Sequence, residues 1–106
     1  MNSEIENELN NTVKYIVKNL EKYYENNEWE EFVNDAIDIT IEKYINDNEI
    51  SGFSVLLAFG NPIIEWLYHR GTTYIIASWS GKSIIQPLDS KIADSFLNFL
   101  NETVKF

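Results

Sequence analysis

The apolar residues of this chain change their spacing near residue 50, and this change constrains the fold more than any other feature. From Ile5 to Tyr23 they recur every three or four residues, the spacing of one face of an amphipathic helix. After Gly52 they fall into short runs that alternate with small or polar residues and are separated by turn residues, which is typical of strands. The sequence therefore predicts an α+β fold, with helices first and a sheet afterwards.

The helical half predicts two helices joined by Asn26-Asn27. The first covers about residues 4–25. The second covers about 28–47, and its apolar face consists of Trp29, Phe32, Val33, Ala36, Ile37, Thr40 and Tyr44. Because the joint is so short, we expect the two helices to form an antiparallel hairpin.

The second half predicts four strands and a final helix. The strands cover about 52–59, 63–69, 73–79 and 83–86, and the helix about 90–104 with Asp89 as its N-cap. Short turns between the strands indicate an antiparallel meander, so the order is ααββββα within one domain, residues 1–106. The first three strands carry apolar residues on both faces, which predicts either helices on both faces or a homodimer through the sheet.

Composition excludes several classes of protein. Among the 106 residues there is no cysteine, so disulfides, thiolate metal sites and a cysteine nucleophile are excluded. No apolar run approaches the roughly 18 residues of a membrane span, and the N-terminus is polar and acidic, unlike a signal peptide. We therefore expect a cytoplasmic protein without a membrane partner, in the host cytoplasm if it is encoded by a phage.

The negative charge lies entirely in the first half. The chain has 17 acidic and 8 basic residues for a net charge of −9, and 13 of the acids with only four of the bases lie in residues 1–49. Such a field repels nucleic acid and favours basic partners, so direct binding to nucleic acid is not expected.

One row of acids stands out in the predicted helix 28–47. Its members recur at steps of three and four and are Glu28, Glu31, Asp35, Asp38 and Glu42. On a helix they would form a line of like charges about 5 Å apart, similar to the phosphates of a nucleic-acid strand. Because such pairs destabilise a helix, the row predicts a partner-binding surface; the alternative is a solvated helix face.

Aromatic residues are the second candidate contact. Trp66, Tyr68 and Tyr74 could share one face of the second hairpin, where exposed aromatics would supply short-range affinity to a protein partner. The alternative is that they belong to the core.

No catalytic or metal-binding pattern is evident. The single histidine, His69, would lie roughly 13 Å from Glu65 along a strand, too far for a base and its orienting group. Ser80-Gly81-Lys82-Ser83 lacks the upstream glycine and the following helix of a phosphate loop. We therefore predict a protein that is not an enzyme and binds no metal or cofactor; a polar pocket around His69, Glu65 and Ser78 would indicate otherwise.

Two stretches resemble a known pattern. Leu57-Ala58-Phe59-Gly60-Asn61-Pro62-Ile63-Ile64-Glu65-Trp66 and Ala77-Ser78-Trp79-Ser80-Gly81 are similar to uncharacterised proteins of low-GC Gram-positive bacteria and their mobile elements. In those proteins a strand ends in Gly-Gly-Pro and a Trp-Gly follows; here Asn61 replaces the middle glycine and Ser80 interrupts the Trp-Gly pair. This resemblance brings no established activity.

In size, acidity and its row of carboxylates the chain also resembles phage inhibitors of host defence, such as anti-CRISPR and antirestriction proteins that mimic DNA. That resemblance implies an inhibitory protein that occupies the nucleic-acid groove of a basic defence nuclease. The alternative is an immunity or adaptor protein that binds one basic partner such as a toxin.

Overall fold

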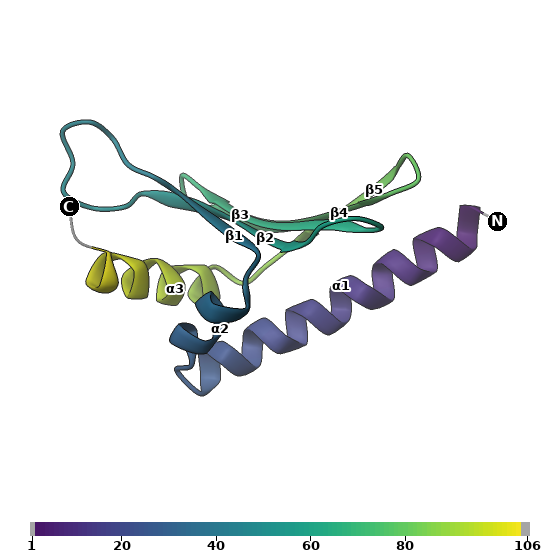
Figure 1. Ribbon diagram of the computed structural model, residues 1–106, viewed down its shortest axis with the longest axis horizontal. Coiled ribbons are helices and arrows are strands. Elements are labelled where there is room, and N and C mark those ends of the chain that lie inside the picture. The colour runs from purple at the N-terminus through teal and green to yellow at the C-terminus, as the bar shows by residue number, and fades with distance from the viewer. Residues whose placement is uncertain (1, 105–106) are drawn as a thin grey trace.

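Figure 1 shows the computed structural model of the chain, which describes residues 2–104. A twisted antiparallel sheet forms one layer, and the helices of this described part form the other. The helices are α1 (Asn2–Glu25), α2 (Trp29–Asp35) and α3 (Ser90–Thr103). The strands are β1 (Asp38–Glu42), β2 (Gly52–Ala58), β3 (Ile63–His69), β4 (Thr72–Trp79) and β5 (Lys82–Pro87). The α+β class, the meander and the C-terminal helix are confirmed, whereas residues 2–104 form five strands and not four.

Turn chemistry explains the regular order of the meander. The β3–β4 turn has positive φ at Arg70 (50°) and Gly71 (81°), and the β4–β5 turn repeats this at Ser80 (51°) and Gly81 (78°). Two-residue loops of this kind match the twist of paired strands, so each strand returns beside the one before it. Strands β3, β4 and β5 are therefore consecutive neighbours in the sheet, whose full order is β1-β2-β3-β4-β5.

The predicted helix over residues 28–47 is wrong. The helix ends at Asp35, and the chain then forms the edge strand β1 against β2. The residues after Asp35 are rich in β-branched side chains, which lose rotamer freedom in a helix and pack well on a sheet. Ile39 and Ile41 both face the core side of β1, each opposite a buried residue of β2, so the segment follows a period of two. The predicted helical hairpin is thus a long helix followed by the short α2.

All helices of the described chain lie on the same side of the sheet (Figure 1). The expectation of helices on both faces is therefore wrong, and the homodimer remains an untested prediction. We call the sheet face that carries no helix the outer face.

The core between the layers is rich in aromatic rings. Its centre is formed by Trp29, Phe32, Phe53, Trp66 and Phe96. The centroids of Phe53 and Trp66 are 4.8 Å apart, and those of Trp29 and Phe96 are 5.0 Å apart. Contacts of this geometry add to the stability gained from area burial alone. The core therefore fixes α2 and α3 against the middle strands.

Candidate partner-binding surfaces

The predicted acidic row is divided by the fold. Glu28, Glu31 and Asp35 stay together at α2, whereas Asp38 and Glu42 lie on β1. A separation of four residues places two side chains on the same face of either a helix or a strand, so this spacing could not distinguish the two. The resemblance to DNA mimics relied on a helical line of five carboxylates, and only three of them lie at the helix.

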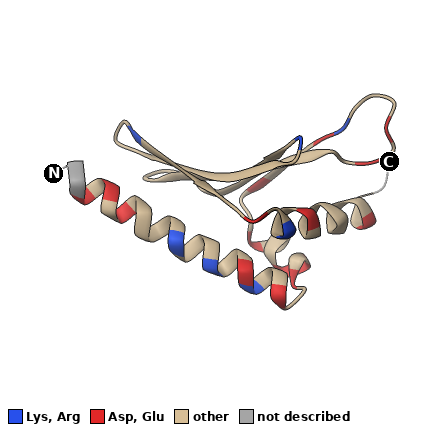
Figure 2. Cartoon of the chain, turned by 180° about the vertical axis from the view of Figure 1, so that it is seen from behind, with Lys and Arg blue, Asp and Glu red and all other residues tan. Residues whose placement is uncertain are grey.

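The α2 acidic cluster comprises Glu28, Glu30, Glu31 and Asp35 (Figure 2). No ion pair involves these four carboxylates within residues 4–104. A hydrogen bond with Glu28, followed by the negative charge of Glu28, slight burial and the charges of Asp35 and Glu30, raises the pKa of Glu31. The cluster is thus a local concentration of negative charge with which no cation of the described chain forms an ion pair.

Tyr23 of α1 forms a hydrogen bond with Asp35, the last acid of this cluster. Its hydroxyl donates to Asp35 Oδ2 at 3.2 Å. Burial, then the hydrogen bond to Asp35 and the charges of Asp35, Glu31 and Glu28, raises the pKa of Tyr23. The neutral phenol therefore orients the Asp35 carboxylate without removing its charge.

A wide groove of about 750 Å³ continues the acidic surface between α2 and α3. Its walls carry Glu30, Asp94 and Glu102 with a single lysine, Lys91, and Phe99 supplies an apolar side. Carboxylates thus outnumber cations in the groove as they do on α2.

The prediction of an exposed aromatic surface around the second hairpin is wrong for two of its three residues. Trp66 is completely buried, and Tyr68 is 8% exposed, so both belong to the core. Tyr74 lies on the outer face, because it is opposite Leu67 whereas Trp66 is opposite Ile75. Burial, then the hydrogen bond that its hydroxyl donates to Asp94 and the charge of Asp94, raises the pKa of Tyr68.

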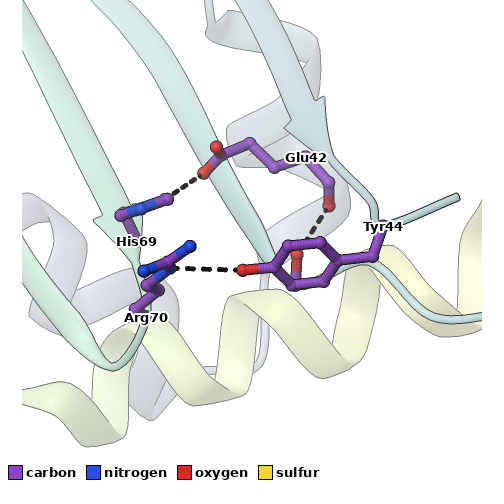
Figure 3. Close-up of polar contacts among 5 residues, drawn as sticks. Glu42, Tyr44, His69 and Arg70 are labelled. Carbon is purple, nitrogen blue, oxygen red and sulfur yellow. Dashed lines mark hydrogen bonds and ion pairs between the residues drawn. The ribbon is translucent and has the colours of Figure 1, made fainter. Parts of the chain in front are cut away.

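Glu42 and His69 make the side-chain hydrogen bond shown in Figure 3, which becomes an ion pair when the imidazole is protonated. Glu42 Oε1 lies 2.9 Å from His69 Nδ1, so the contact joins β1 to β3 across β2. Glycine at position 52 makes this crossing feasible, because a Cβ there would lie 2.6 Å from Glu42 Oε1 and 2.5 Å from the carbonyl oxygen of Tyr68. Arg70 Nε donates to the Tyr44 hydroxyl at 3.2 Å beside it, which gives the edge strand a second link.

These contacts do not form a catalytic arrangement of the kind considered from the sequence. His69 contacts Glu42 and not Glu65, and the Ser78 hydroxyl is hydrogen-bonded to Ser83 at 3.0 Å. Within the described residues no group of three or more histidine or acidic side chains could hold a metal ion. A pocket of about 190 Å³ lies beside the pair, and Glu42 and His69 already contact each other at its wall. The contact between Glu42 and His69 is best explained as a structural link at the sheet edge.

Two features of these surfaces were missed from the sequence. Asp94 and Glu102 were not associated with the acids of the first half, because only the packing of α3 beside α2 brings them to one groove. The sequence also did not predict a surface role for Glu65, although a carboxylate within an apolar strand is a signal for one.

Comparisons with protein-family models, curated proteins and solved structures gave no significant match. Over residues 2–104 no helix has the length and apolar character needed to cross a membrane. Interpretation of the site therefore rests on its geometry and charge.

Proposed function

We propose that this chain is a non-enzymatic inhibitory protein that binds a basic, nucleic-acid-binding partner and excludes the nucleic acid. The class of partner is a defence nuclease, as for the anti-CRISPR and antirestriction proteins. The observation that carries the proposal is the α2 acidic cluster, where four carboxylates lie close together and form no ion pair within residues 4–104.

The energetics of α2 support a role in binding. Glu28 and Glu31, three residues apart, and Glu31 and Asp35, four apart, are pairs of like charge, and each such pair destabilises a helix by a few tenths of a kcal/mol. The pKa of Glu31 is raised by a hydrogen bond with Glu28 and then by the negative charge of Glu28, so ionisation of Glu31 is disfavoured in the folded protein. A basic partner would relieve the repulsion by placing cations between the carboxylates, and the field would also accelerate association.

The geometry also limits how far the cluster can imitate a nucleic acid. Glu28, Glu31 and Asp35 recur at three and four residues, so their spacing along the helix axis is about 5 Å. Three charges cover a short part of a phosphate backbone, and the groove acids Asp94 and Glu102 extend the surface sideways. The surface is therefore suited to blocking a local basic groove rather than to replacing a long duplex.

The test is inhibition of DNA cleavage by a panel of purified CRISPR effector and restriction nucleases. We compare the wild-type chain with Glu30→Lys/Glu31→Lys and with the matched control Glu4→Lys/Glu8→Lys. Both variants change the same number of exposed acids, but the control acids lie at the far end of α1. We expect the α2 variant to inhibit about tenfold less, the effect of about 1.4 kcal/mol of lost binding energy, and the control to resemble the wild type.

Inhibition by the wild-type chain should also weaken as salt rises and as competing DNA is added. If no nuclease of the panel is inhibited, or if the two variants lose inhibition equally, the proposal is wrong.

A further inference from the structure

The outer face of the sheet combines apolar residues with carboxylates. One row across four strands consists of Leu56, Glu65, Ile76 and Ile85, which are consecutive cross-strand partners. Ile85 is 62% exposed although it lies in a strand. No helix of residues 2–104 covers this row (Figure 1). Soluble proteins leave such faces bare when another molecule contacts them.

Glu65 is the residue that needs an explanation. It is half-buried in the middle strand, between Leu56 on one side and Ile76 on the other. Its hydrogen bond is weak, because Ser54 Oγ donates to its Oε2 at 3.4 Å, and no ion pair forms at Glu65 within residues 4–104. A carboxylate that is partly removed from water is stabilised by a cation, and this one has no cation in the described chain.

A groove of about 320 Å³ lies beside Glu65. Leu56, Ile63 and Phe59, the last 74% exposed, give it apolar walls. Asp38 of β1 and Glu65 of β3 place two carboxylates in the same groove. Apolar walls with carboxylates match the two parts of an arginine or lysine side chain, its aliphatic stem and its charged head.

We propose that the outer face docks a partner segment in which arginine or lysine alternates with apolar residues. The basic head lies between Asp38 and Glu65, its stem packs on Leu56 and Ile63, and the flanking apolar side chains cover Ile76. This surface is on the face of the sheet that points away from α2 and α3. The inference therefore goes beyond the proposed function and does not depend on it.

Charge argues against a second copy of the chain as the occupant. The outward-facing acids of the strands are Asp38, Glu42 and Glu65, and the outward-facing base is His69, which already contacts Glu42. Two such faces would bring unneutralised carboxylates against each other or against apolar rows, and burying an unpaired charge is costly. A basic partner supplies the missing cations.

The experiment is a titration of the full chain with a short acetylated and amidated peptide of alternating arginine and valine, followed by amide chemical shifts in NMR spectra. Two further peptides replace arginine by glutamine or valine by glycine. We expect shifts centred on β1, β2 and β3 around Glu65, with weaker binding of both altered peptides.

The decisive variant is Asp38→Asn/Glu65→Gln, which keeps the side-chain shapes and removes both charges. Its matched control, Glu4→Gln/Glu8→Gln, removes two exposed acids of α1. We expect the affinity for the arginine–valine peptide to fall about tenfold in the first variant, as expected for the loss of charge-assisted contacts, and to stay unchanged in the control.

Three results would overturn the inference. Shifts confined to α2 and α3 would refute it while supporting the acidic groove as a basic site. Shifts of the outer face that depend on protein concentration without peptide would identify a second copy as the occupant. Absence of binding, or equal losses in both variants, would show that the outer face has no preference for basic segments.

Discussion

The Thr73 hydroxyl links the buried indole of Trp66 to the backbone of β3 through two hydrogen bonds. Its hydroxyl accepts from Trp66 Nε1 at 2.7 Å and donates to the carbonyl of Leu67 at 2.9 Å. Thr73 is only 5% exposed and Trp66 is completely buried, so water cannot replace these bonds. The substitution Thr73→Val keeps the shape of the side chain and removes both.

The expected loss follows from these contacts. A buried donor left without an acceptor costs about 1–3 kcal/mol, and burial of the added methyl group offsets up to about 0.8 kcal/mol. We therefore expect Thr73→Val to lower the free energy of unfolding by about 1–2 kcal/mol, a substantial part of the roughly 5–15 kcal/mol typical of a domain. The matched control Thr72→Val alters the exposed neighbour on the same strand and should stay within about 0.5 kcal/mol of the wild type.

Urea unfolding followed by circular dichroism measures both values. A double-mutant cycle with Trp66→Phe then isolates the hydrogen bond, because phenylalanine has no indole donor. Thr73→Val should cost less in the Trp66→Phe background than in the wild type. Equal costs in both backgrounds, or a Thr73→Val variant as stable as Thr72→Val, would refute the reasoning.

Three further predictions concern stability. Gly52→Ala should destabilise the fold by about 1–3 kcal/mol, because its Cβ would lie 2.5 Å from the carbonyl oxygen of Tyr68; thermal unfolding measures this, and an unchanged melting temperature would contradict the crossing geometry. Glu31→Gln should raise the melting temperature at pH 7, because a folded-state pKa above the ordinary 4.5 means that ionisation of Glu31 disfavours the native state. That gain should disappear below pH 4.5, where Glu31 is protonated in both states, and a gain that is independent of pH would argue against repulsion from Glu28. Asp89→Ala removes the acceptor for the amide of Lys91 at 3.0 Å, so chemical unfolding should show a loss of about 1 kcal/mol, and no loss would mean that the cap is unimportant.

Local patterns were sufficient for much of the fold. The stripe that includes Leu9, Val13 and Leu20 predicted α1, and these residues are buried in the core. The strands from residue 52 to 87 followed from alternation and from turn residues, and Asp89 caps α3 as its position indicated. These features depend on neighbours within a few residues, which the sequence displays directly.

The sequence by itself determined the excess of carboxylates, the class of the fold and the meander, because each depends on composition or on short-range spacing. Only the tertiary structure decided that the segment after Asp35 is a strand, since β2 offered its β-branched residues an apolar face and a hydrogen-bonded edge that no local pattern reveals. The same holds for the burial of Trp66 and for the position of Glu65 on the outer face, which follow from strand register and from where the helices pack. Strand register and the side on which the helices pack are set by contacts between distant parts of the chain. A one-residue shift in register would exchange the buried and exposed faces of a strand.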